Sequence, residues 1–144
     1  MLILILMNID RWFVDPFSLH QSMSWLLLVC SVYLVVAGVL QLRRGGQTGE
    51  RVPGDSRHAF ERTTLLVTTG IYKYIRHPLY SSLLFLTWGV LCKDPSPAAL
   101  LVAGIATLFL VVTAFVEESE CIASLGTAYR TYMSRTKRFI PFLI

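Results

Sequence analysis

Charged residues are scarce in this sequence: Asp, Glu, Lys and Arg make up 15% of its 144 residues. A soluble globular domain carries about 25%. The deficit is concentrated in three runs without any charge, at residues 16–42, 78–92 and 95–116. A membrane-spanning helix needs about 20 apolar residues, and the first and third runs reach that length. The lack of charge therefore excludes an ordinary soluble domain and indicates an integral membrane protein.

The second run is short for a span and would suit the core helix of a soluble protein if it stood alone. Between two long apolar runs it is better read as the first arm of a helical hairpin, with its turn at Lys93–Pro97, which holds two prolines. We therefore predict an all-α fold: an integral membrane helical bundle forming one domain over residues 1–144. Its expected membrane helices cover residues 24–42, 78–92 and 98–116.

The N-terminal stretch Met1–Met7 is apolar but brief, and no basic residue precedes it. A signal peptide would have a positive start and a longer apolar centre, so we do not predict one. We expect residues 1–23 to form an interfacial segment that lies on the membrane surface or packs on another helix, with Trp12 and Trp25 near the headgroups.

Basic residues are distributed unevenly, which predicts the orientation. Seven of the thirteen Lys and Arg lie between Arg43 and Arg76, and four lie between Arg130 and Arg138. Because positive loops stay in the cytosol, segments 43–77 and 117–144 are expected on that side, which gives a multi-pass protein with three crossings. Topology and anionic headgroups explain the net charge of +4 more simply than nucleic acid does.

Several common sites are missing from the sequence. The three cysteines are odd in number and widely spaced, and the three histidines show no ligand spacing, so neither a disulfide framework nor a metal site is predicted. There is no G-x-G-x-x-G motif and no expected strand to carry one. A soluble nucleotide-binding domain is therefore not expected.

Two polar clusters lie at the expected cytosolic ends of the helices. The first, LLVTTGIYKYIRHPLY, occupies residues 65–80, and the second, EESECIASLGTAYRTYMSRTKRFIP, occupies residues 117–141. Arg76 and the tyrosines could simply be a topology anchor and an interfacial aromatic belt. Glu117 and Glu118 could be a solvated turn. Alternatively, one carboxylate binds a cation and the other is structural, because consecutive helical residues point about 100° apart.

These clusters resemble a known family. The order G-x-Y-x-x-x-R-H-P-x-Y, Glu-Glu, Leu-Gly-x-x-Tyr-x-x-Tyr and Arg-Phe-Ile-Pro is similar to isoprenylcysteine carboxyl methyltransferases and their phospholipid methyltransferase relatives. The likeness covers residues 65–141, and the chain resembles the compact prokaryotic members. It implies a membrane methyltransferase that binds S-adenosylmethionine at the cytosolic face. By position, the cofactor contacts it implies are Leu66, Val67, Thr68, Gly70, Tyr72, His77, Pro78, Tyr80 and Glu117.

The chemistry of the cofactor suits these residue types. An acid would take the ammonium, and the helix start at Arg76 and His77 would suit the carboxylate. Methyl transfer from a sulfonium mainly requires alignment, so we assign no catalytic residue and regard Arg76 and His77 only as candidates. Arg130 and Arg138 are candidates to bind an anionic substrate headgroup, or they are surface anchors.

The acceptor is expected to be lipid-like or prenylated, with its tail entering sideways between helices. A carboxylate is already ionised at neutral pH whereas an amine must lose a proton, so O-methylation is favoured over N-methylation. Two positions depart from the family pattern. Thr113 stands where prenylcysteine enzymes have a substrate-binding arginine, and Ser82 stands where many relatives have glycine.

Two other functions fit the same pattern. A sterol-type reductase has a similar helical arrangement and would bind NADPH, and a non-enzymatic membrane subunit would use the tyrosines and arginines only as anchors. The sequence does not predict the oligomeric state.

Overall fold

The computed structural model describes residues 2–12, 14, 18–48 and 66–141. Their elements, in chain order, are α1 (Leu2–Met7), η1 (Ile9–Arg11), α2 (Leu19–Thr48), η3 (Gly70–Lys73), α3 (Pro78–Leu91), α4 (Pro97–Leu125) and α5 (Thr127–Arg135). The predicted all-helical class is confirmed for this part of the chain, whose named elements are all helices and in which Ile75 and Lys137 form an isolated parallel β-bridge. The expected loop over residues 43–77 is described only in part, because residues 49–65 lie outside the described ranges.

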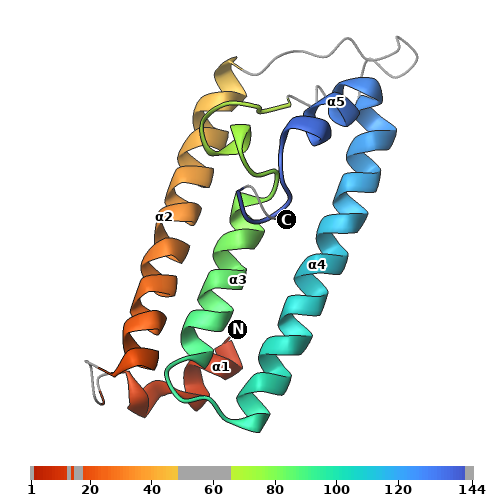
Figure 1. Cartoon of the computed structure of the whole chain (residues 1–144). Helices are drawn as coiled ribbons and strands as arrows, with labels where there is room; N and C mark the ends of the chain where they lie inside the picture. Colours follow the sequence, from red (N-terminus) through yellow and green to blue (C-terminus); the bar gives the residue numbers. More distant parts are fainter. Residues whose placement is uncertain (1, 13, 15–17, 49–65, 142–144) are drawn as a thin grey trace.

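Helices α2, α3 and α4 run side by side, with α3 between the two longer helices (Figure 1). Small residues allow α2 and α3 to approach closely, as in many membrane bundles. A Cβ added at Gly38 would lie 3.1 Å from a methyl of Leu79. Two hydroxyls also bridge the helices, since Ser24 donates to the carbonyl of Gly89 and Ser31 to that of Ser82, both at 2.7 Å.

The turn predicted at residues 93–97 joins α3 to α4. Ser96 caps α4 by accepting a hydrogen bond from the amide of Ala99 at 3.2 Å, and Pro97 occupies the first helical position. The helix then continues to Leu125, nine residues beyond the expected span end at residue 116. Its extension carries the acidic pair away from the apolar part of the helix.

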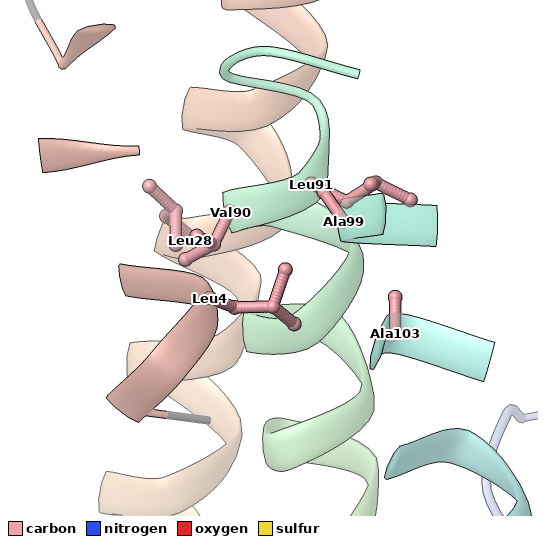
Figure 2. Close-up of a cluster of buried hydrophobic side chains, with 6 residues drawn as sticks. All are labelled: Leu4, Leu28, Val90, Leu91, Ala99 and Ala103. Atoms are coloured by element: carbon pink, nitrogen blue, oxygen red, sulfur yellow. The ribbon is translucent and has the colours of Figure 1, made fainter. Parts of the chain in front are cut away.

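A small hydrophobic core closes the end of the bundle that contains this turn. Helix α1 inserts Leu4 among side chains of the three long helices (Figure 2), and these are Leu28, Val90, Leu91, Ala99 and Ala103. Helix α1 thus packs against α3 and α4, which is one of the two placements expected for the N-terminal stretch.

Lys93, in the turn at this end, is buried. Its Nζ lies 3.8 Å from the ring centre of Trp25 and 5.5 Å from that of Trp12. The ammonium also donates to Oε1 of Gln21 at 2.9 Å. Cation–π contact and this hydrogen bond offset part of the cost of taking the charge out of water.

Two helices are long and apolar enough to cross a membrane, over Leu19–Arg44 and Pro97–Leu125. Only 22% and 17% of their most apolar windows are buried, whereas the core helix of a soluble protein would be mostly buried. Large apolar side chains such as Leu101, Leu108 and Phe109 instead point outward. This exposure fits a lipid environment. Helix α3, at 14 residues, is about 21 Å long and shorter than the hydrocarbon core.

Candidate functional site

Glu118 is the centre of a buried ion cluster at the far end of the bundle from Lys93. Arg76, just before α3, donates from Nε to Oε1 of Glu118 at 2.8 Å. Arg138, near the C-terminus, donates from Nη2 to Oε2 at 2.6 Å and from Nε to both oxygens at 3.1 Å. Burial would raise the pKa of Glu118, but the hydrogen bonds from Arg138 and Arg76 outweigh it and lower the pKa to about 2. The carboxylate is therefore ionised at neutral pH.

The cluster lies outside the apolar run of α4, and backbone hydrogen bonds extend it. The amide of Arg76 donates to the carbonyl of Lys137 at 2.8 Å, and the amide of Lys137 donates to the carbonyl of Tyr74 at 3.0 Å. Nη1 of Arg76 donates to the carbonyl of Thr136 at 2.6 Å. These bonds fasten the C-terminal segment beside the start of α3, where Figure 1 shows it turning back between α3 and α4.

His77 lies next to this cluster and is buried. Its Nε2 is 3.3 Å from Oε1 of Glu118, and its Nδ1 is 3.7 Å from Oε2 of Glu117. The imidazole stacks on Tyr80, with ring centres 5.4 Å apart and an angle of 18° between the planes. Burial lowers the pKa of His77 below 6.5, and Arg76 acts in the same direction against the opposing effect of the two glutamates. Burial therefore favours the neutral form of the imidazole.

The two glutamates differ in their surroundings. Glu118 is buried and bound by both arginines, whereas the side chain of Glu117 is 46% exposed. Burial and then the charge of Glu117 raise the pKa of Tyr72 to about 12. The arrangement leaves Glu117 as the carboxylate that a ligand can reach.

The segment around Tyr72 is held from two sides. The hydroxyl of Tyr132 on α5 donates to the carbonyl of Tyr72 at 2.7 Å. Gly70 has a φ of +61°, which favours glycine, and an added Cβ would lie 2.5 Å from Oε1 of Gln41 on α2. Glycine at this position therefore lets η3 pack against α2.

The structure brings together most of the predicted site residues. Tyr72, His77, Pro78, Tyr80 and Glu117 gather between the start of α3 and the end of the apolar part of α4, together with Arg76. Leu66, Val67 and Thr68 are half-buried ahead of η3. Arg138 is engaged by Glu118, while Arg130 is exposed on α5.

Sequence reasoning did not predict how the site is held in place. It expected one glutamate of the acidic pair to be structural but gave it no partner, and it missed Thr136 and Ser81, whose hydroxyl donates to the carbonyl of Phe139 at 2.7 Å. The available signals were Tyr132 in Leu-Gly-x-x-Tyr-x-x-Tyr and the Arg-Phe-Ile-Pro ending, which the family resemblance included without giving them a structural role. The arginine of that ending is the second partner of Glu118.

An apolar cavity of ≈ 530 Å³ lies beside the ion cluster, between α3 and α4. Phe85 and Trp88 line it from α3, and Phe115 from α4. Arg138 and Phe139 line it from the C-terminal segment, and the guanidinium of Arg138 lies 3.8 Å from the ring centre of Phe115. The cavity thus combines an apolar body with a cationic end next to Glu118.

Comparison with known proteins assigns the class. The profile of the phospholipid methyltransferase family matches residues 19–126, which is most of the chain. The chain therefore belongs to the phospholipid methyltransferase family, and the resemblance seen in the sequence is confirmed. No solved structure matches the chain significantly.

The curated relatives are similar over parts of their length. A methanethiol S-methyltransferase from a Pseudomonas species is 32% identical over 71 residues, which are 49% of this chain and 26% of that protein. The corresponding protein of Crocosphaera subtropica is 30% identical over 76 residues, covering 53% and 29%. A protein-S-isoprenylcysteine O-methyltransferase of Schizosaccharomyces pombe is 26% identical over 130 residues, covering 88% and 52%. The chain thus spans between about a quarter and a half of the relatives it matches.

Proposed function

We propose that this protein is a membrane methyltransferase that uses S-adenosylmethionine to methylate a lipid-like acceptor. The observation that carries the proposal is the junction between two sites. The partly exposed carboxylate of Glu117 lies 3.7 Å from Nδ1 of His77, whose Nε2 lies 3.3 Å from Oε1 of Glu118 in the Arg76–Glu118–Arg138 cluster. The apolar cavity shares Arg138 with that cluster.

The residues at the first site fit the cofactor. Its sulfonium supplies an activated methyl group when bound. Glu117 would hold the ammonium, because its carboxylate is partly exposed while that of Glu118 is bound by two arginines. The first turn of α3 would receive the carboxylate at its free amides. Arg76 supports this turn indirectly, because its guanidinium is bound to Glu118 and Thr136.

The cavity suits the apolar part of an acceptor. Its aromatic lining would shelter a prenyl or acyl tail, and its cationic end would draw an acceptor carboxylate toward the methyl donor. Arg138 would therefore act at the boundary of the two sites. It would take the role of the substrate-binding arginine that prenylcysteine enzymes have at the position of Thr113. Thr113 itself is exposed on α4 and donates to the carbonyl of Phe109. A carboxylate acceptor remains favoured over an amine. Arg130 would contact headgroups from α5.

We further propose three membrane crossings, formed by α2, α3 and α4, with the ion cluster on the cytosolic side. Basic residues favour this orientation, because Arg43, Arg44 and the arginines around Glu118 lie at one end of the bundle. The short α3 can cross because α2 and α4 flank it and the C-terminal segment covers its start.

The cofactor assignment is tested by calorimetric titration of the detergent-purified protein with S-adenosylhomocysteine. Glu117→Gln is expected to lower the affinity about tenfold or more, because one charge-assisted hydrogen bond contributes about 1.5–3 kcal/mol. Glu120→Gln is the matched control, since Glu120 is exposed on the same helix.

Equal affinity in both variants would overturn the role of Glu117. Binding of NADPH instead would indicate a sterol-type reductase, and binding of neither compound would indicate a non-enzymatic subunit. Membranes incubated with methyl-labelled cofactor would then identify the product, because label in a base-labile ester indicates O-methylation of a carboxylate.

A further inference from the structure

A long groove follows α2 on a different part of the molecule from the ion cluster. Its first part is a cavity of ≈ 790 Å³, lined almost entirely by apolar side chains between Trp25 and Leu40. Its second part is a cavity of ≈ 550 Å³ between the C-terminal half of α2 and η3, which lie beside each other in Figure 1. Both parts are lined by Tyr33, Ala37 and Leu40, so the two cavities adjoin along α2, and we refer to them together as the groove.

The chemistry of the groove changes along its length. The part toward Trp25 has an apolar lining, as expected at hydrocarbon depth. The other end is lined by two exposed basic residues, Arg44 from α2 and Lys73 from η3, with the exposed Tyr74 beside them. An apolar groove that ends in two cations is complementary to an amphiphile with an anionic headgroup.

The length of the second cavity along α2 matches one membrane leaflet. At 1.5 Å per residue, α2 rises about 16 Å from Tyr33 to Arg44. Half of a hydrocarbon core of about 30 Å is nearly the same length. A lipid with its phosphate at Arg44 would therefore extend an acyl chain past Ala37 to Tyr33.

We propose that this groove binds an anionic glycerophospholipid of the leaflet that faces the basic end. Its phosphate contacts Arg44 and Lys73, and one acyl chain lies in the groove over Ala37. This lipid is distinct from the proposed methyl acceptor, because the groove shares no lining residue with the apolar cavity beside Arg138. The groove does adjoin the candidate cofactor site, since the expected cofactor contact Gly70 lines its polar end, whereas Tyr72 is buried and bound by Tyr132. The proposal rests on the membrane placement of α2 and does not require methyl transfer.

Native mass spectrometry in a mild detergent tests the proposal. The purified protein is mixed with equal amounts of phosphatidylglycerol and phosphatidylcholine carrying the same acyl chains, and the retained lipids are counted. The wild type is expected to retain phosphatidylglycerol preferentially. Arg44→Gln and Lys73→Gln should each weaken this retention about fivefold, since each basic residue near an anionic headgroup contributes about 1 kcal/mol.

Two matched controls separate the groove from general surface charge and from misfolding. Arg43→Gln removes an adjacent exposed charge that lines neither cavity, and it should leave retention unchanged. Ala37→Phe should block the acyl chain while keeping both cations. Val112→Phe places the same ring on an exposed part of α4 and should have no effect.

Equal retention of the two lipids by the wild type would overturn the proposal. So would equal losses in the Arg43 and Arg44 variants, or full retention in Ala37→Phe. If the lipid-free protein is a dimer that Ala37→Phe dissociates, the groove is an interface between copies instead. Binding of S-adenosylhomocysteine is measured on the same samples, so a failure of the methyltransferase assignment remains distinguishable.

Discussion

Glu118 and Arg138 form a bidentate ion pair between α4 and the C-terminal segment, with Nη2 of the arginine 2.6 Å from Oε2 of the glutamate. Arg76 binds the same carboxylate from the start of α3. One buried glutamate therefore joins three segments that are separate in the sequence. Removing one partner of a buried ion pair destabilises a protein more than replacing both partners with apolar residues does. The reason is that the remaining charge stays buried without a counter-charge.

We predict that Glu118→Gln destabilises the protein by about 3–5 kcal/mol, because it leaves Arg76 and Arg138 buried without a counter-charge. Unfolding by denaturant in detergent micelles measures the change. Glu120 lies two residues further along the same helix and is exposed, so Glu120→Gln should change stability by less than about 0.5 kcal/mol. A similar stability for the two variants would contradict the structural role of Glu118.

The ion cluster also predicts a dependence of stability on pH. The pKa of Glu118 is about 2 in the folded protein against an ordinary value of 4.5, so the unfolded chain binds the proton more tightly. The resulting stabilisation, on the order of 3 kcal/mol, is fully present above pH 4.5 and is lost as the pH falls toward 2. Denaturation midpoints measured between pH 6 and pH 3 should therefore decrease less steeply in Glu118→Gln than in the wild type. Parallel curves would show that other carboxylates cause the acid sensitivity.

The sequence predicts more of the fold than of the candidate site. Expected helix limits of 78–92 and 98–116 compare with observed limits of 78–91 and 97–125, because hydropathy and the prolines at the turn mark the hairpin directly. Hydropathy could not predict that α4 continues to Leu125, since the added turns are polar. Hydropathy also predicted a first membrane helix over residues 24–42, whereas α2 covers residues 19–48.

The different surroundings of Glu117 and Glu118 show why the site was harder to predict than the fold. Helical geometry predicted that the two carboxylates point in different directions, but not which one is buried. That choice depends on Arg76 and Arg138, which are brought to α4 by the backbone pairing of Ile75 with Lys137. A pairing between segments 62 residues apart leaves no periodic pattern in the sequence. The roles of the individual site residues remain predictions.

The contact between α2 and α3 gives a prediction with a matched pair of glycines. A Cβ at Gly38 would meet Leu79 at 3.1 Å and Pro78 at 3.4 Å, whereas one at Gly104 would meet nothing within 4 Å. Gly38→Leu should therefore destabilise the protein by about 1–3 kcal/mol through overpacking. It should also weaken binding of S-adenosylhomocysteine, because it displaces the first turn of α3. Gly104→Leu should be neutral or slightly stabilising, since leucine favours the helix. Equal effects in a thermal-shift assay would show that α2 and α3 separate without penalty.

The hydroxyl of Tyr132 connects α5 to the candidate cofactor site through one hydrogen bond, 2.7 Å long, to the carbonyl of Tyr72. Tyr132→Phe removes the donor and leaves a buried carbonyl without it, an effect of about 1–3 kcal/mol. Because η3 then loses a support on its inner side, we expect the affinity for S-adenosylhomocysteine to fall about fivefold or more. Tyr33→Phe removes an exposed hydroxyl on α2 and should bind the ligand as the wild type does. If Tyr132→Phe lowers the unfolding temperature but keeps full affinity, the bond stabilises the fold only and Tyr72 is not a cofactor contact. Reduced affinity at an unfolding temperature well above that of the titration would instead assign Tyr132 as a positioning residue for Tyr72.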